Sequence, residues 1–254
     1  MVVGEVIGEG WHCRVYPHGS SSVAKRYKFV IRAKKRKKFE DFMVKYNTAL
    51  CDGGVPLSKT SLRFENSFKD RQRPIWIQER FSKDELLINI FSDSDTSDIL
   101  KISEQIFRNT ASLTVYNNDA IIKAGMDNHI SNWAYRNGNI SMFDNVPPMT
   151  IEDGILEFIF GKSKISIPQW FLPSFVKSWL FGAKMTVRFI TSVSRRFPRL
   201  EQILVEQAKD ICSSEFPENN LLLEGTKLTK AERIEDKIYL GLLWRSVKLM
   251  EEKD

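Results

Sequence analysis

Residues 125–144 have the sequence GMDNHISNWAYRNGNISMFD and predict a β-hairpin. Two short apolar and aromatic runs, WAYR and NISMF, flank Asn137 and Gly138. This dipeptide suits a turn that needs positive φ at both central positions. Asn-Gly hairpins occur in α+β proteins of every kind, so the turn predicts structure and leaves function open.

Polar side chains gather at the open end of this predicted hairpin. Pairing residues at equal distances from the turn places Asn132 opposite Phe143, with Asp144 beside Asn132. Asp127 lies in the loop that enters the hairpin. Carboxylate and carboxamide oxygens are hard ligands of the kind that Mg²⁺ takes, which points to phosphoryl transfer. The alternative is that these side chains bond their own backbone, as Asp and Asn commonly do in loops.

Composition indicates a soluble globular protein. The chain has 254 residues, of which 42% are hydrophobic and 28% charged. Its three cysteines form no close pair, so we expect neither a zinc site nor a disulfide framework, and a reducing compartment fits best. No secretory signal is visible, and the most apolar region, 167–190, is interrupted by prolines and charges. We therefore expect a cytoplasmic protein without a transmembrane segment.

Positive charge is concentrated in one region of the chain. The formal net charge is +6, and residues 25–38 hold nine lysines and arginines and no acid. Such a patch can attract nucleic acid, an anionic membrane or a phosphorylated substrate. We favour a solvated helix entry instead, because helical spacing begins at Phe39 and aromatic residues are not interleaved with the basic ones. A nucleic-acid partner is therefore disfavoured.

A glycine-rich segment near the N-terminus also bears on function. Gly8 and Gly10 stand between two apolar, strand-like runs, which predicts a glycine-rich hairpin. Glycines allow backbone amides to approach a triphosphate closely. Lys25 follows in the next predicted strand, where an inward position would place its ammonium near phosphates. The alternatives are an ordinary tight turn and a surface lysine.

The order of these motifs resembles the signature of the protein-kinase-like superfamily. The resemblance rests on Gly8-x-Gly10-x-x-x-x-Val15, Val23-Ala24-Lys25, Asp127-x-x-x-x-Asn132 and Asp144. The short connection from the glycines to the lysine, and the histidine in Asp127-Asn128-His129, are more similar to the aminoglycoside and choline phosphotransferase branch and to atypical bacterial kinases. The resemblance covers about 140 residues.

The resemblance implies an α+β, bilobal protein-kinase-like fold. Residues 1–80 would form a small N-lobe with an antiparallel sheet and one helix. Residues 81–254 would form a larger, mostly helical C-lobe with the catalytic loop in 125–145. Apolar spacing predicts the helices, with faces at Phe39–Leu50, Ile99–Leu113, Leu200–Cys212 and Ile234–Leu249. The aromatic segment 170–190 is expected to be core.

The resemblance also implies ATP and Mg²⁺ as cofactors. The nucleotide would be bound by Gly8, Gly10 and Val15 around the glycine loop, by Lys25 at the α and β phosphates, and by backbone groups of Gln78, Glu79 and Arg80 at the adenine. The acidic partner of Lys25 would be Glu40 or Asp41 on the following helix.

The catalytic roles are implied in the same way. Asp127 would orient or deprotonate the acceptor hydroxyl, and Asn132 and Asp144 would hold Mg²⁺. Asn145-Val146 follows Asp144 where protein kinases have Phe-Gly, and Gly125 replaces a histidine, so a regulated protein kinase is not indicated.

Three functions follow from these observations. The first is a kinase-like phosphotransferase acting on an unidentified hydroxyl of a small molecule, lipid or protein. The second is a pseudokinase that binds nucleotide as an interaction module, because Cys13 replaces the third glycine of the loop. The third, ranked last, is a basic nucleic-acid-binding protein.

Overall fold

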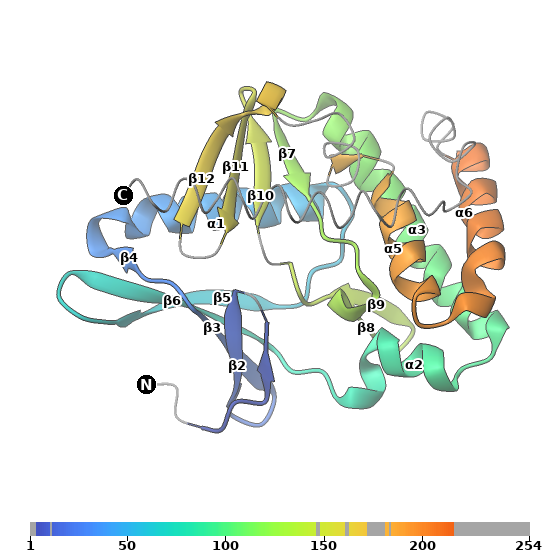
Figure 1. Cartoon of the computed structure of the whole chain (residues 1–254), viewed down its shortest axis with the longest axis horizontal. Coiled ribbons are helices and arrows are strands. Elements are labelled where there is room, and N and C mark those ends of the chain that lie inside the picture. The colour runs from blue at the N-terminus through green and yellow to red at the C-terminus, as the bar shows by residue number, and fades with distance from the viewer. Residues whose placement is uncertain are drawn as a thin grey trace.

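The computed structural model of the chain describes residues 4–10, 12–145, 148–160, 163–171, 181–182 and 184–215. The molecule is α+β, with an antiparallel sheet in the N-terminal part and most of its helices later in the chain (Figure 1). Within the described ranges, no helix combines the length and apolarity needed to cross a membrane. The predicted division at residue 80 falls just after a strand and stays a prediction.

Six strands build the N-terminal sheet. Their bounds are β1 Gly8–Glu9, β2 Cys13–His18, β3 Ser22–Tyr27, β4 Ile31–Arg32, β5 Thr60–Asn66 and β6 Arg71–Glu79. The order along the sheet is β1-β2-β3-β6, with β4 and β5 each pairing with β6, and every pairing is antiparallel. Lys25 on β3 pairs with Val15 on one side and Trp76 on the other, so these three side chains share one face.

Helix α1, Arg36–Asp52, packs against this sheet with the apolar face that its spacing predicts. Phe39, Phe42 and Met43 are buried with residues of the sheet in one hydrophobic cluster. Tyr46 and Leu50, on the next turns, belong to a second and larger cluster. The helix therefore takes part in both cores.

The larger cluster is built on helices α2 Leu87–Asp93, α3 Thr96–Asp119, α5 Lys184–Ser194 and α6 Glu201–Glu215. The Asp95 side chain caps α3 by accepting a hydrogen bond from the Asp98 backbone N–H at 2.9 Å. The Phe189 ring meets the rings of Phe91 and Phe107 edge to face. The helices predicted at Ile99–Leu113 and Leu200–Cys212 are confirmed.

The expectation of a mostly helical region after Pro148 is wrong. Strands β10 Met149–Glu152, β11 Ile155–Phe160 and β12 Ser163–Pro168 join β7 Ile122–Gly125 in an antiparallel sheet of order β12-β11-β10-β7. The turn between β10 and β11 is Asp153-Gly154, and both residues have positive φ (48° and 73°). Asp-Gly is a hairpin dipeptide of the same kind as Asn-Gly.

Short 3₁₀ helices connect these elements, at Ala33–Lys35, Lys83–Glu85, Ile130–Asn132, Gln169–Phe171 and Pro198–Leu200. Within the aromatic segment 170–190, Phe181 and Phe189 are buried as expected, whereas Trp170 is 72% exposed. The expected roles of Phe175 and Trp179, and the helical face expected at 234–249, lie outside the described residues.

Candidate functional site

The predicted hairpin is present. Strand β8, Trp133–Arg136, pairs with β9, Asn139–Met142, in antiparallel register. Asn137 and Gly138 form the turn with φ of 52° and 84°, which is the conformation that the dipeptide predicts.

The open end of the hairpin brings Asp127, Asn132 and Asp144 together. The Asn132 carbonyl accepts hydrogen bonds from the backbone N–H groups of Phe143 at 3.0 Å and Asp144 at 3.4 Å. The Asn132 side-chain amide donates to the Asp127 carbonyl at 2.8 Å. The neighbourhood expected from pairing distance is therefore the one observed.

Lys25 reaches the same place from the N-terminal sheet. Its Nζ donates to Asp144 Oδ1 at 3.0 Å and to the Phe143 carbonyl at 2.7 Å, although Asp144 is 119 positions away in the chain. The Lys25 side chain is 6% exposed and that of Asp144 39%. This ion pair joins β3 to the hairpin, with the lysine on the buried side.

The glycine-rich loop between β1 and β2 lies beside Asp144. Gly10 N–H donates to the Cys13 carbonyl at 2.9 Å, which closes a tight turn. Burial, and to a smaller extent the charge of Asp144, raises the pKa of the Cys13 thiol to about 11. Burial lowers the pKa of His12, while Asp144 acts in the opposite direction. The charge of Asp144 thus acts on the pKa of both His12 and Cys13.

The predicted acidic partner of Lys25 is wrong. Glu40 accepts from Arg36 Nε at 2.9 Å, and Asp41 accepts from Lys37 Nζ at 2.5 Å, both as i,i+4 pairs along α1. The face of α1 that packs against the sheet carries apolar side chains, so neither acid is brought to Lys25. Asp144 takes that place.

The predicted binding of adenine by backbone groups of Gln78–Arg80 is wrong for the N–H groups of Glu79 and Arg80, because both already donate hydrogen bonds within the protein. Glu79 N–H donates to the Lys59 carbonyl at 3.2 Å, and Arg80 N–H donates to the Ser21 carbonyl at 2.9 Å. Gln78 contributes its side chain instead, because its amide donates to the Phe143 carbonyl at 2.6 Å.

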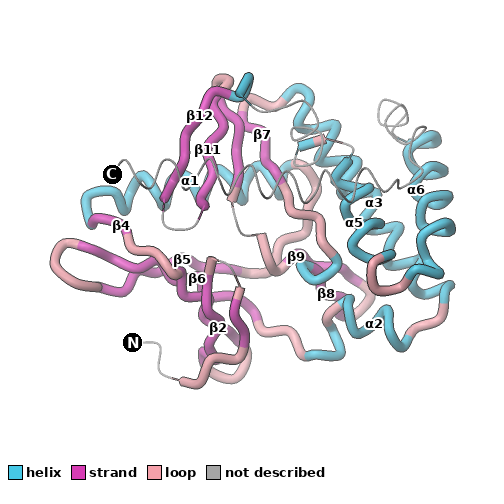
Figure 2. The backbone as a smooth tube through the Cα atoms, viewed as in Figure 1, coloured by secondary structure: helices cyan, strands magenta, loops and turns pink. Residues whose placement is uncertain are grey.

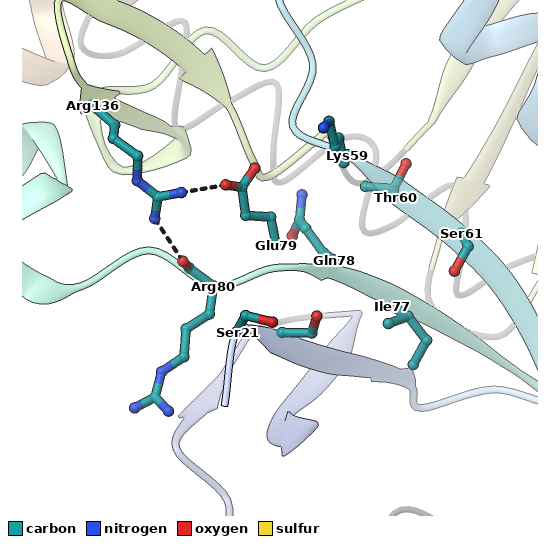
Figure 3. Close-up of a pocket in the computed structure, with 10 residues that line it drawn as sticks. Ser21, Lys59, Thr60, Ser61, Ile77, Gln78, Glu79, Arg80 and Arg136 are labelled. Atoms are coloured by element: carbon teal, nitrogen blue, oxygen red, sulfur yellow. Dashed lines mark hydrogen bonds and ion pairs between the residues drawn. The ribbon is translucent and has the colours of Figure 1, made fainter. Parts of the chain in front are cut away.

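Gln78, Glu79 and Arg80 line a pocket of about 560 Å³, shown in Figure 3. The other lining residues come from β3, β5, β6 and β8 and from the segments that lead into β3 and β5, and Lys25, Asp127 and Asp144 are not among them. Arg136 from β8 reaches Glu79 and the Arg80 carbonyl, and its Nε contacts Glu85 at 2.5 Å. The Arg136 guanidinium lowers the pKa of Glu85 to about 2. Arg136 thus links the β8–β9 hairpin to the end of β6 in the N-terminal sheet.

Two side chains at the site were not predicted. Arg188 of α5 donates from Nε to Asp127 Oδ1 at 2.5 Å, across 61 positions that carry no local motif for it. The Phe143 ring lies 5.7 Å from the Phe81 ring, and Lys25 Nζ lies 5.3 Å from the Phe143 ring centre. The position of Phe143 directly before Asp144 was the only available indication that it would matter.

Buried polar side chains hold the loop that carries Asp127. The fully buried Asn128 amide donates to Thr110 Oγ1 at 3.0 Å and to the Met185 carbonyl at 3.1 Å. Its oxygen accepts from Trp133 Nε1 at 2.8 Å. Because α3, α5 and β8 all contribute to this network, the loop is fixed from three elements.

Comparison with known proteins places the chain in a family. A search of curated proteins finds no match. Among solved structures, the chain is similar to one titled "WaaP in complex with acyl carrier protein", with 13% sequence identity and a TM-score of 0.34 over 57% of this chain and 61% of that one. The match thus spans less than two thirds of the length of that protein. The model of a family of unknown function, DUF6206, matches residues 18–235, and the chain belongs to that family.

Proposed function

We propose that this protein is an ATP- and Mg²⁺-dependent phosphotransferase that transfers the γ-phosphate to an acceptor hydroxyl. The ion pair between Lys25 and Asp144 carries the proposal. Phosphotransferases of the kinase type place a lysine of the third strand and a magnesium-binding aspartate at the same phosphates. Here a lysine on β3 and the aspartate after the hairpin are already in contact.

The side chains at the site fit a magnesium ion. Asp144 uses Oδ1 for Lys25, and within the described residues its Oδ2 has no hydrogen-bond partner. The neighbouring Asn132 adds an amide oxygen, which accepts from Ser131 Oγ at 3.2 Å, and Mg²⁺ is commonly bound by one or two carboxylates plus water and phosphate. Among the described residues, no group of three or more His, Cys, Asp and Glu side chains is suited to a metal, so the proposed set is this carboxylate and amide. Mg²⁺, when bound, would neutralise charge on the phosphate oxygens.

Asp127 is the proposed base for the acceptor hydroxyl. Its Oδ1 accepts from Arg188, which fixes the carboxylate. The Arg188 guanidinium also brings positive charge next to Asp127, where it would stabilise negative charge on a transferred phosphoryl group. Arg188 is therefore proposed as a positioning residue for Asp127.

A second candidate is a nucleotide-binding module without turnover. Two observations favour it. Arg188 occupies one oxygen of Asp127, and the Phe143 ring lies close to both Phe81 and the Lys25 ammonium, which is the group proposed to bind phosphate. This candidate keeps the phosphate and magnesium roles of Lys25 and Asp144 and removes the role of Asp127 as a base.

The test separates binding from turnover. Binding of a non-hydrolysable ATP analogue is measured by calorimetry with Mg²⁺ and with EDTA, and phosphate release from MgATP is measured with and without varied alcohol acceptors. Asp144→Ala is expected to abolish turnover and remove the dependence of binding on Mg²⁺. Asp127→Asn is expected to abolish turnover and leave binding within about twofold. Asp84→Ala, at an exposed acid that takes no part in the contacts of Lys25, Asp127 or Asp144, is the control.

Each result has a defined meaning. Unchanged turnover in Asp144→Ala contradicts the proposal. Binding that requires Lys25 and Asp144, together with no phosphate release from the unaltered protein, supports the second candidate. Absence of nucleotide binding contradicts both candidates.

A further inference from the structure

A cluster of positive charge lies at the end of the N-terminal sheet, away from the candidate site. We call it the basic tip and define it as residues 32–38 together with the β5–β6 turn, residues 67–71. Arg32 pairs across the sheet with Arg71, and Ala33 N–H donates to the Asp70 carbonyl at 2.6 Å. Figures 1 and 2 show this hairpin projecting beside β4 and the start of α1, at the opposite side of the molecule from α2 and α6.

Most cations of the basic tip have no acidic partner. Arg36 and Lys37 pair with Glu40 and Asp41 on the next turn of α1. Within the part of the chain that the structure describes, no ion pair is made by the six others, which are Arg32, Lys34, Lys35, Lys38, Lys69 and Arg71. All six are exposed.

Three further features of the basic tip each cost free energy on a surface that contacts only water. Like charges directly opposite one another in a sheet destabilise it, and Arg32 faces Arg71 in this manner. Phe68 at the apex of the hairpin is 74% exposed, and Lys69 Nζ lies 5.2 Å from its ring. Lys69 itself has a positive φ of 56°, which a non-glycine residue rarely adopts.

We propose that the basic tip docks on the surface of an anionic phospholipid bilayer. Clusters of four to eight lysines and arginines are attracted to anionic lipid headgroups, and the tip has six that make no ion pair among the described residues, against one exposed acid, Asp70. An aromatic side chain without polar atoms gains free energy when it enters the boundary between headgroups and acyl chains. Phe68 at the apex would enter that boundary while the surrounding cations contact phosphates.

A nucleic acid fits this surface less well. Single-stranded nucleic acid is bound in a basic groove where several aromatic side chains stack on successive bases. The basic tip is a projecting turn, and Phe68 is the exposed aromatic residue at its apex. The proposal concerns a surface separate from Lys25 and Asp144, so it stands whether or not the protein turns over ATP.

Vesicle co-sedimentation of the full chain tests the proposal. The vesicles are pure phosphatidylcholine, or two parts phosphatidylcholine to one part phosphatidylserine, each at low and high salt. We expect binding to the anionic vesicles alone, and weaker binding at high salt. Each cation removed is worth about fivefold in partitioning, so Lys34→Glu with Lys35→Glu is expected to weaken binding by at least about 25-fold.

Matched variants distinguish the basic tip from general surface charge. Lys59→Glu with Lys83→Glu makes the same change of charge at exposed lysines outside the tip. Vesicle binding of this double variant is expected to stay within about fourfold of that of the unaltered protein. Phe68→Ala is expected to weaken binding severalfold at both salt concentrations, because the lost contribution is apolar. Circular dichroism verifies that each variant is folded.

Three outcomes would overturn the proposal. Absence of binding to anionic vesicles, or an equal loss in the Lys59/Lys83 variant, overturns the proposal. Binding of a single-stranded RNA oligonucleotide without binding to vesicles also overturns it and assigns the tip to nucleic acid.

Discussion

The contact between Lys25 and Asp144 joins a nearly buried ammonium to a carboxylate that is open to solvent. An uncompensated charge in a buried position is costly, whereas a solvated carboxylate loses little when its partner is removed. The two members of the pair therefore differ in what their replacement costs. Part of the compensation also comes from the Phe143 carbonyl, which accepts from Lys25 independently of Asp144.

This asymmetry predicts the stability of single and double variants. Asp144→Ala is expected to lower the free energy of unfolding by about 1–3 kcal/mol, because it leaves the Lys25 charge with a carbonyl alone. Lys25→Met is expected to cost less, since it removes the buried charge itself. Urea denaturation of both variants and of the double variant measures the coupling, expected to be about 1 kcal/mol. Strictly additive effects would contradict a direct contribution of the pair.

At the residue scale, the sequence predicts the members of the site better than their partners. Asn132 and Asp144 follow from the hairpin, whose turn sets their separation, and Asp127 lies in the loop that enters it. The resemblance implies Glu40 or Asp41 as the partner of Lys25, and this is wrong because both acids pair along α1, with Arg36 and Lys37. Arg188 had no local pattern, because a contact across 61 positions depends on how α5 packs.

At the scale of elements, the packing of β7 explains why a glycine, Gly125, stands close to the candidate site. Gly125 ends this strand two positions before Asp127. A Cβ at Gly125 would lie 2.8 Å from the Phe181 ring and 3.2 Å from the Met149 Cβ on the neighbouring strand β10. Glycine is therefore favoured at position 125, because the Phe181 ring and Met149 of β10 leave no room for a Cβ.

Gly125→Ala is consequently expected to destabilise the protein by about 1–3 kcal/mol through overpacking. Thermal or urea unfolding measures the effect. Gly10→Ala is the control, since a Cβ there would meet only the Cys13 carbonyl oxygen at 3.9 Å, and its cost is expected to stay below about 1 kcal/mol. Equal stability of Gly125→Ala and the unaltered protein would mean that Phe181 moves aside freely.

The elements also show where reading the sequence succeeds and where it stops. Asn137-Gly138 predicts β8 and β9 because neighbouring apolar runs are short and separated by two residues. Asp153-Gly154 carries the same information for β10 and β11, but the many apolar residues after it resemble a buried helix as much as a strand. Apolar spacing over several turns predicts α1, α3 and α6 without this ambiguity.

At the scale of the whole molecule, α1 is the element that links the two hydrophobic clusters. Phe39 packs with Trp76 and the N-terminal sheet, and Leu50 packs in the cluster that holds Trp133 and the site-bearing loop. A helix that must be folded for both clusters to be complete couples their stabilities. The sequence predicts each face of α1 but not that its two halves belong to different cores, because that depends on what lies beside them.

This arrangement predicts a single cooperative unfolding transition for the described parts of the chain. Phe39→Ala and Leu50→Ala each remove a buried side chain, so each is expected to lower the free energy of unfolding by about 2–5 kcal/mol and to shift the same transition. Val44→Ala, on the exposed side of the same helix, is expected to change it by about 0.5 kcal/mol or less. Far-ultraviolet circular dichroism and tryptophan fluorescence during urea unfolding should coincide in all three variants. Two separate transitions, with Phe39→Ala affecting only one of them, would show that the sheet and the helical core unfold independently and that α1 does not couple them.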